Sequence, residues 1–261
     1  MNENILNVGI HGAAGRMGTR LIQLIAGDPQ LELAAALERA GHPQLGEDAG
    51  SLAGVSPLKV ALASSLAADA ELDVMVDFSL PEGSLAVARM CADRKIPLVV
   101  GTTGFDGTGR AAIESLAVRI PILIAPNMSR AVNLLMHLVR ETARALGDQA
   151  DIAIIERHHR TKKDAPSGTA LRLADFARKG LAAAAQGDEG KPAHSDVSMH
   201  ALRIADSPGE HTVVFAMLGE TIELSHRALN RDGFARGALD AAKFLAGKPA
   251  RLYSIEDVLG C

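Results

Sequence analysis

The sequence predicts an α/β protein: a doubly wound parallel β-sheet joined to a second α+β domain built on a mainly antiparallel or mixed sheet. Three observations predict it. Short apolar runs alternate with helical segments through the first half of the chain, a glycine-rich turn follows the first apolar run, and three strand-like runs follow one another after residue 196. Strands that alternate with helices pair in parallel, whereas consecutive strands pair mainly antiparallel.

The first half of the chain consists of strand–helix repeats. Buried strands are expected at residues 6–10, 31–37, 74–78, 98–101 and 122–125, with a short strand near Val60. Helices are expected at residues 16–26, from Pro81 onward and after Asp106, and residues 38–58, rich in Gly, Pro and Asp, are expected to form a loop. Pro81 supports the start of its helix because proline favours the first helical position.

The pattern changes after residue 127. Apolar residues at helical spacing, among them Leu135, Val139 and Leu146, predict a helix over residues 132–146. A strand at 151–156, a helix at 168–185, a polar loop at 186–196 and strand-like runs near 197–205, 211–217 and 220–228 come next, before a last helix at 232–246. We therefore expect two domains, residues 1–127 with 232–261 and residues 128–231.

Composition argues against several classes of function. The 261 residues carry a net charge of -4 and a pI of about 6.1, whereas general nucleic-acid and membrane binders are usually basic. No apolar run approaches the roughly 18 residues of a membrane-spanning helix, and the start of the chain does not resemble a signal peptide. Cys91 and Cys261 form no CxxC pair, so we expect reduced thiols, no metal site and a cytoplasmic protein.

A glycine-rich turn follows the first expected strand and opens the first helix. It reads Gly12-Ala13-Ala14-Gly15-Arg16-Met17-Gly18. Such glycines permit a tight turn and a close approach to a pyrophosphate, and N–H groups at the helix start bind phosphate oxygens. The spacing is GxxGxxG instead of the commoner GxGxxG. The turn predicts a dinucleotide-binding Rossmann-type domain, and the alternative is a turn of this kind without a ligand.

An acid at the end of the second strand supports the dinucleotide. Glu38 lies about 20 residues beyond the glycines, where a carboxylate binds the ribose hydroxyls of NADH. Arg39 comes next, and a guanidinium there suits the 2′-phosphate of NADPH. The pair predicts use of both cofactors. The alternative is an ordinary exposed ion pair at a strand end.

Two further segments lie at the carboxyl ends of expected strands, where open α/β sheets bind ligands. They are Gly101-Thr102-Thr103-Gly104 and Ala125-Pro126-Asn127-Met128. Their hydroxyl and backbone groups are suited to contact a nicotinamide. Each segment alone is more typical of an ordinary turn.

A basic segment stands out in this acidic chain. Residues 156–164 contain four Lys or Arg and two His, and they run into Ala165-Pro166-Ser167-Gly168-Thr169, which resembles a helix start with Ser167 as N-cap. Cations beside the N–H groups of a helix start predict a site for a small dicarboxylate. A solvated charged loop is the main alternative.

Two other interpretations of this segment have weaker support. A metal site from Glu156, His158 and His159 lacks clear tetrahedral spacing, and Ser167 lacks the GxSxG turn of a nucleophile. Reduction by hydride requires a proton donor or an anion-stabilising group. His158 or His159 titrates in the right range, and Lys162 is charged and flexible enough to assist.

These segments resemble the 4-hydroxy-tetrahydrodipicolinate reductase family, formerly called dihydrodipicolinate reductase, of bacterial lysine and diaminopimelate biosynthesis. The family motif is an acid, two histidines, a lysine and Asp-Ala-Pro-Ser-Gly-Thr-Ala, which matches Glu156, His158, His159, Lys162 and residues 164–170. The glycine-rich turn, residues 101–105 and residues 234–238 also match. The resemblance covers essentially the whole chain.

The resemblance implies reduction of 4-hydroxy-tetrahydrodipicolinate, via dihydrodipicolinate, to tetrahydrodipicolinate with NADH and/or NADPH. It implies His158 as proton donor or acceptor, Lys162 as proton donor, and substrate contacts from His159, Gly168 and Thr169. It also implies a homotetramer formed through the sheet of the second, substrate-binding and oligomerisation domain. The residues implied for cofactor binding are Gly12, Ala13, Ala14, Gly15, Arg16, Met17, Glu38, Arg39, Gly101, Thr102, Thr103, Ala125, Pro126, Asn127 and Met128. Met128 stands where the family often has Phe.

Two other functions remain open at this point. One is another amino-acid-pathway dehydrogenase with the same architecture, such as a homoserine or aspartate type. The other is a dinucleotide-sensing regulator that uses the basic segment to bind a partner or a nucleic acid.

Overall fold

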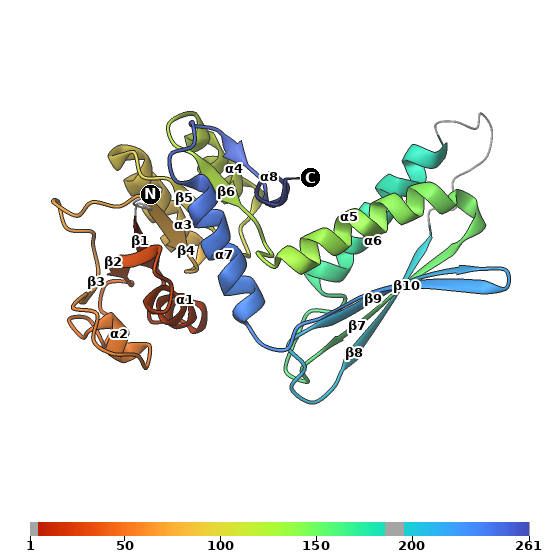
Figure 1. Cartoon of the computed structure of the whole chain (residues 1–261), viewed down its shortest axis with the longest axis horizontal. Coiled ribbons are helices and arrows are strands. Elements are labelled where there is room, and N and C mark those ends of the chain that lie inside the picture. Colours follow the sequence, from red (N-terminus) through yellow and green to blue (C-terminus); the bar gives the residue numbers. More distant parts are fainter. Residues whose placement is uncertain (1–4, 186–195, 261) are drawn as a thin grey trace. The chain divides into compact units, whose positions relative to one another are not determined.

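The computed structural model describes residues 5–185 and 196–260. Most of the expected polar loop 186–196, and Cys261, lie outside the described residues. The chain divides into two compact units, one formed by Met1–Ser129 with Asp232–Cys261 and the other by Arg130–Arg231. Each unit is described below by itself (Figure 1).

The first unit contains a seven-stranded sheet whose neighbouring strands all pair in parallel. Its order is β11-β6-β5-β4-β1-β2-β3, the Rossmann order with one strand added at the β6 edge. The strands are β1 (Leu6–His11), β2 (Leu31–Leu37), β3 (Leu62–Ala63), β4 (Val74–Asp77), β5 (Leu98–Val100), β6 (Ile122–Ile124) and β11 (Leu252–Tyr253). The expected doubly wound sheet is confirmed.

Helices cover both faces of this sheet, as the alternation of buried side chains requires. Val74 and Val76 belong to the apolar cluster that includes α1 (Arg16–Ala26) and α7 (Asp232–Leu245). Met75, between them, belongs to the cluster that includes α3 (Pro81–Arg94) and α4 (Gly107–Ser115). Both faces of the central strands are therefore buried, which explains their continuous apolar runs.

The expected loop 38–58 contains a short helix that the composition did not predict. α2 (Ala49–Leu52) is capped by Asp48, whose carboxylate accepts hydrogen bonds from the N–H of Ser51 at 2.8 Å and of Leu58 at 3.2 Å. One carboxylate therefore caps the helix and holds the following turn. The unit ends with α8 (Ile255–Leu259), which follows β11.

The second unit contains a four-stranded sheet of order β10-β9-β7-β8. Its strands are β7 (Asp151–His158), β8 (Val197–Arg203), β9 (Glu210–Met217) and β10 (Glu220–Arg227). β9 pairs antiparallel with β7 and β10, whereas β7 and β8 are parallel and are separated in the chain by α6 (Gly168–Ala185). The expected mixed sheet is confirmed. β7 continues two residues beyond the expected end at Glu156, to His158.

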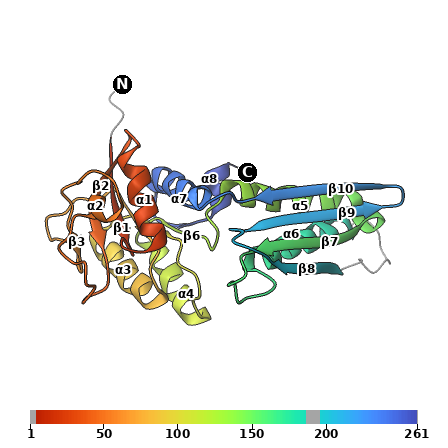
Figure 2. The same cartoon turned by 90° about the horizontal axis from the view of Figure 1, so that it is seen from below.

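One face of this sheet packs against α5 (Arg130–Leu146) and α6 (Figure 2). Alternate residues of the two central strands, such as Ile152, Ile154, Val213 and Phe215, are buried against these helices. The intervening residues of the same strands form the other face. This outer face becomes important below.

Candidate functional site

The glycine-rich turn of the first unit is packed too closely for larger residues at two positions. A Cβ on Gly12, whose φ is +78°, would lie 2.5 Å from the carbonyl oxygen of Phe78. A Cβ on Gly18 would lie 2.2 Å from the carbonyl oxygen of Gly12. The turn therefore sits directly on the loop after β4 and brings the start of α1 close to the sheet, as dinucleotide-binding turns require.

Some backbone N–H groups of this turn donate to carbonyl groups of the protein, and others lie at the start of α1, where a ligand could accept from them. Those of Gly12 and Ala13 donate to the carbonyl of Leu37 at 2.9 and 3.0 Å, and that of Gly15 donates to Gly12 at 3.1 Å. The N–H groups of Gly12, Ala13 and Gly15 are therefore used within the protein, and the expected phosphate contacts of the turn stay a prediction that residues 16–18 suit best. These form the first turn of α1, where a helix has no internal acceptors for its N–H groups.

Glu38 lies beside the turn, as expected for the acid of a dinucleotide site. Its carboxylate accepts a hydrogen bond from the N–H of Ala14 at 3.3 Å and from that of Arg39 at 2.9 Å. Glu38 is half-buried and Arg39 is exposed. The carboxylate thus has a fixed place next to the glycines, while the guanidinium has room to move.

A pocket of about 500 Å³ lies at the carboxyl ends of the strands in the first unit. It is lined by Arg16, Met17, Gly101, Thr102, Thr103, Pro126, Asn127 and Met128, all expected, and by Phe78, Ser79, Leu80 and Phe234, which were not expected to contact the cofactor. The strand-end rule applied to residues 74–78 would have found the first three. Phe234 comes from α7, more than 100 residues further along the chain than Met128, and its place in the family-like segment 234–238 did not indicate that it lines this pocket.

Asp77 organises the loops around this pocket. It is fully buried at the end of β4 and accepts hydrogen bonds from His11 Nδ1 at 2.7 Å, Ser79 Oγ at 2.7 Å and Thr102 Oγ1 at 2.8 Å, with Ser84 Oγ as a further donor. Thr102 Oγ1 in turn accepts from the N–H of Ser79 at 2.9 Å. The Thr102 hydroxyl therefore holds two pocket loops together and gives its proton to Asp77, and its expected contact with the cofactor stays a prediction.

The second unit collects the side chains of the basic segment by strand alternation. Glu156 and His158 lie two residues apart on β7 and so face the same side of the sheet. In the sheet register, Arg203 on β8 pairs with His158, and His211 on β9 pairs with Glu156. Residues paired in register share a face, so all four side chains lie on the face that packs against the helices.

Glu156 and His158 form a buried pair. Glu156 is 1% exposed and its Oε2 accepts a hydrogen bond from His158 Nδ1. Despite the desolvation of its carboxylate, the hydrogen bonds from Arg203 and His158 hold the pKa of Glu156 below its ordinary value. Burial lowers the pKa of His158, and Glu156 opposes part of that effect. The expectation of a solvated loop therefore does not apply to these two residues.

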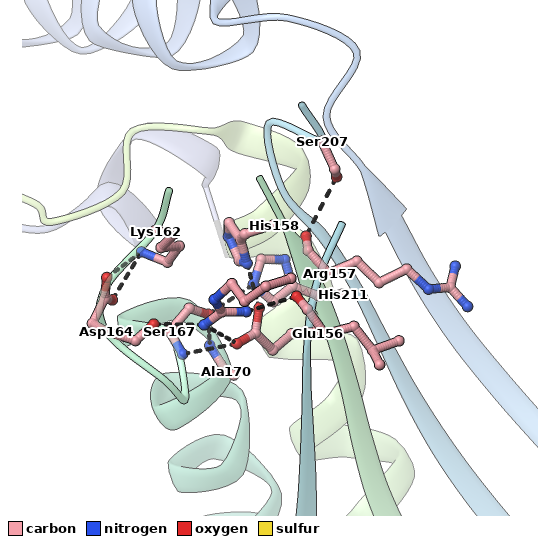
Figure 3. A network of polar contacts seen from close by, with 11 residues as sticks. Glu156, Arg157, His158, Lys162, Asp164, Ser167, Ala170, Ser207 and His211 are labelled. Atoms are coloured by element: carbon pink, nitrogen blue, oxygen red, sulfur yellow. Dashed lines mark hydrogen bonds and ion pairs between the residues drawn. The ribbon is translucent and has the colours of Figure 1, made fainter. Parts of the chain in front are cut away.

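Lys162 and His159 lie in the turn that follows β7. Lys162 Nζ donates to the carboxylate of Asp164 at 2.8 Å, and His159 Nδ1 lies 2.8 Å from Thr161 Oγ1. The backbone of the turn is tied to the loop after β8, because the N–H of His159 donates to the carbonyl of Ser207 at 2.8 Å. Arg157 does not belong to the site: its side chain pairs with Glu210 at 3.2 Å and points away from the network (Figure 3).

The start of α6 lies next to the buried pair. Ser167 is 2% exposed, its Oγ accepts a hydrogen bond from the N–H of Ala170 at 3.2 Å, and it therefore caps the helix as expected. Its N–H donates to Glu156 Oε1 at 3.3 Å, and its Oγ lies 3.1 Å from His211 Nε2. Because Glu156 contacts both His158 and Ser167, the expected proton donor lies beside the expected anion-binding helix start that contains Gly168 and Thr169.

His211 lies outside the basic segment in the sequence, and the structure places it in this network. It is 4% exposed, and its ring centroid lies 5.2 Å from that of His158. Burial lowers its pKa to about 4, so it is neutral at neutral pH. The sequence did not indicate that His211 lies near His158, because the two are brought together only by the pairing of β7 with β9.

The part of the chain that the structure describes has neither a cluster of metal-ligating side chains nor a membrane-spanning helix. Within residues 5–185 and 196–260, no group of three or more His, Cys, Asp or Glu side chains is arranged to hold a metal ion. Over the same residues, none of the helices combines the length and the apolarity needed to cross a bilayer. The single carboxylate of Glu156 and the imidazole of His158 instead bond to each other.

Two stretches that together cover nearly the whole chain match a known family. Residues 6–128 match the family described as dihydrodipicolinate reductase, N-terminus, and residues 131–259 match dihydrodipicolinate reductase, C-terminus. The chain belongs to the dihydrodipicolinate reductase family. Members of this family are oxidoreductases of lysine and diaminopimelate biosynthesis that use NADH or NADPH, and the N-terminal domain binds the nucleotide.

Individual relatives agree with this family along nearly the whole chain. A protein named 4-hydroxy-tetrahydrodipicolinate reductase from an Anaeromyxobacter species is 46% identical, over 98% of this chain and 98% of its own. Its namesake from Syntrophotalea carbinolica is 43% identical, over 98% and 99% of the two chains. Among solved structures, a dipicolinate-bound dihydrodipicolinate reductase from Paenisporosarcina sp. TG-14 has a TM-score of 0.74 at 23% identity, covering 96% and 97%, and supports the fold.

Proposed function

We propose that this member of the dihydrodipicolinate reductase family reduces 4-hydroxy-tetrahydrodipicolinate, via dihydrodipicolinate, to tetrahydrodipicolinate. The observation that carries the proposal is the buried Glu156–His158 pair beside the capped start of α6, within the motif matched to the family. This arrangement offers a proton donor next to a helix start that suits carboxylates. Glu156 and His158 are spaced two residues apart because side chains at that spacing lie on the same face of β7.

A bound NADH or NADPH supplies the hydride. In the first unit, the first turn of α1 suits the phosphates, Glu38 suits the ribose hydroxyls, and the pocket lined by Thr103 and Asn127 suits the nicotinamide. The closely packed Gly12 and Gly18 allow the backbone to approach such a group. The residues present therefore fit the cofactor that the family uses.

The chain's own acids complete the reduction of the substrate imine. As hydride arrives, the substrate becomes electron-rich and takes up a proton. Glu156 is ionised and accepts the bond from His158 Nδ1, which leaves Nε2 to exchange the proton with the substrate. The lowered pKa of His158 makes its protonated form a stronger acid and a smaller fraction at neutral pH. Lys162, held by Asp164, is the second donor.

The two substrate carboxylates are assigned to His159 and to the N–H groups at the start of α6, at Gly168 and Thr169. Several donors are required because a dianion is costly to desolvate without them. Lys162 adds positive charge to the same turn. The proposal thus places both anions next to the proton donors.

We also propose that the enzyme accepts both NADH and NADPH. Glu38 suits the ribose hydroxyls of NADH, while the exposed Arg39 can swing toward the 2′-phosphate of NADPH. The two values of kcat/KM should differ by less than about 100-fold, which corresponds to about 2.8 kcal/mol. A larger preference would show that only one of the two residues serves the cofactor.

A homotetramer in the cytoplasm completes the proposal. The outer face of the four-stranded sheet carries Ala153, Ile155, Val214 and Ala216 along its central strands, whereas α5 and α6 lie on the other face. Partly exposed apolar residues in the middle of a sheet face favour an interface between copies. Sedimentation should give about 109 kDa, four times the 27.3 kDa of one chain, and Ile155→Lys should reduce that mass.

A coupled assay tests the proposed reaction. Pyruvate, aspartate semialdehyde and the aldolase that condenses them supply the substrate, and NADH or NADPH oxidation is followed. The matched control omits the aldolase. Oxidation should depend on the complete mixture, whereas oxidation of cofactor with homoserine-pathway or other aldehyde substrates alone would favour a different dehydrogenase.

A further inference from the structure

A single buried carboxylate is shared by three parts of the second unit. Glu156, 1% exposed, accepts hydrogen bonds from His158 Nδ1 on its own strand, from Arg203 Nη2 on β8 at 2.9 Å and from the N–H of Ser167 at 3.3 Å. These partners come from β7, from the neighbouring parallel strand and from the cap of α6. An ionised carboxylate only accepts hydrogen bonds, so His158 must carry a proton on Nδ1.

Arg203 reaches both ends of the expected proton-transfer machinery. Its guanidinium donates to Glu156, the partner of His158, and to the carbonyl oxygen of Asp164 at 2.5 Å. The carboxylate of Asp164 in turn holds Lys162 Nζ at 2.8 Å. Both hydrogen bonds come from Nη2, whose two N–H groups are fixed in the plane of the guanidinium and so hold the two acceptors at a set separation. The N–H groups of a lysine ammonium rotate about the end of a flexible side chain and set no such geometry. Arg203 therefore sets the spacing between the strand that carries His158 and the turn that carries Lys162.

The Glu156–Arg203 ion pair also compensates the charge of a buried carboxylate. The Arg203 side chain is 19% exposed and its partner is 1% exposed. Removing one member of such a pair leaves the other buried without compensation. The family motif contains Glu156 but implied no role for it, and Arg203 lies 33 residues beyond the last motif residue, Ala170.

We propose that Glu156 and Arg203 are positioning residues: Glu156 holds His158 with Nε2 toward the substrate, and Arg203 locks Glu156 and the Lys162–Asp164 turn in one arrangement. Their importance for catalysis rests on the proposed function. Neither residue needs to touch the substrate. Both act through the two side chains that exchange protons.

The charges around His158 make the proposal testable by titration. The groups that face it are Glu156 from its own strand, Lys162 from the following turn, Arg203 from β8 and His211 from β9. Burial is the largest influence and lowers the pKa of His158, Glu156 raises it, and Lys162 and Arg203 lower it. Loss of the carboxylate and loss of the guanidinium should therefore move this pKa in opposite directions.

The experiment is an NMR titration of the His158 ring in the ligand-free full-length protein. Glu156→Gln should lower the pKa of His158, and Arg203→Met should raise it, with the pH profile of kcat/KM moving the same way. Arg157→Met is the matched control, because Arg157 pairs with Glu210 in the same sheet but points away from the network. It should leave the titration and the profile of the wild type unchanged.

Arg203→Lys distinguishes the effect of the positive charge of Arg203 from the effect of its hydrogen-bond geometry. It also keeps the proposal testable if Arg203→Met does not fold. It keeps a positive charge, so the pKa of His158 should stay near the wild-type value, while kcat falls by about 100-fold because the turn is misplaced. Shifts in the same direction, or no shift in folded variants, would overturn the proposal, as would full kcat in Arg203→Lys. The titration needs no substrate, so its result does not depend on the proposed reaction. If the wild type is inactive in the coupled assay but the two variants shift the pKa of His158 in opposite directions, the proposed reaction is refuted and this charge arrangement is not.

Discussion

Gly209 lies against the Nε2 edge of His158. A Cβ built on Gly209 would lie 3.0 Å from that nitrogen and 3.3 Å from Cδ2 of the same ring. Because Nδ1 is bonded to Glu156, Nε2 is the ring atom that remains for the substrate. The missing side chain at position 209 therefore leaves room at the Nε2 edge of His158, which is the edge that the proposed proton transfer uses.

Gly209→Ala should reduce kcat by about 100-fold, because a displaced imidazole no longer meets the substrate correctly. Gly219→Ala is the matched control: both glycines have positive φ, +143° and +91°, but a Cβ on Gly219 meets nothing within 4 Å. Both variants should lose roughly 1–3 kcal/mol of stability from backbone strain. Equal kcat in the two variants would show that Gly209 matters only for the backbone.

Lys162→Ala should lower kcat by about 10²- to 10⁴-fold, the usual contribution of a positioned proton donor. The exposed neighbour Lys163 provides the control, since Lys163→Ala removes the same charge from the same turn. Steady-state kinetics with both variants, together with NADH binding by calorimetry, tests the expectation. A loss of similar size in Lys163→Ala would indicate general attraction of an anion instead of a defined role for Lys162.

Protein stability should fall as the pH is lowered from 6.5 toward 4, partly because of His211. Burial lowers the pKa of His211 from 6.5 to about 4, so across this range the unfolded chain binds a proton that the folded chain does not. The contribution is about 3 kcal/mol. Denaturant unfolding at several pH values should show a weaker pH dependence in His211→Gln, whereas His200→Gln, at an exposed position on β8, should behave as the wild type does.

Thr102→Val should weaken dinucleotide binding without touching the second unit. The hydroxyl of Thr102 donates to Asp77 at 2.8 Å and accepts from the N–H of Ser79 at 2.9 Å, and both Thr102 and Ser79 line the pocket. Leaving the Ser79 N–H unpaired costs about 1–3 kcal/mol. Calorimetry should show a higher Kd for NADH, and Thr108→Val, which removes an exposed hydroxyl bonded to Asp106, should leave Kd unchanged.

Local patterns were sufficient to predict most elements of the fold. Apolar runs and helix starts placed β2, α1 and α6 at the bounds that the structure shows. The short helix α2 was missed because a side chain, Asp48, caps it within a segment whose composition is typical of a loop. The sequence predicted a mainly antiparallel or mixed second sheet without assigning its pairs, and the parallel pair of β7 and β8 is joined through the intervening helix α6.

The candidate site was predictable where its residues are contiguous in sequence. The segment from Glu156 to Thr169 was found because charge, helix start and motif coincide within a few residues. Asp77, Arg203, Gly209 and His211 were not found, because each joins its site through strand pairing or through a turn fixed elsewhere. The register between strands that are distant in sequence is set by tertiary packing, so it cannot be predicted from the local patterns of a single sequence.

The role of His158 is tested most directly by comparing wild type and His158→Gln in the coupled assay, with dinucleotide affinity measured in parallel. Glutamine keeps a hydrogen-bonding side chain but cannot transfer the proton. The wild type should oxidise NADH or NADPH only when the condensation substrates and aldolase are present, and His158→Gln should lower kcat by about 10²- to 10⁴-fold with unchanged dinucleotide Kd. Undiminished turnover in His158→Gln, or no turnover by the wild type, would contradict the central claim.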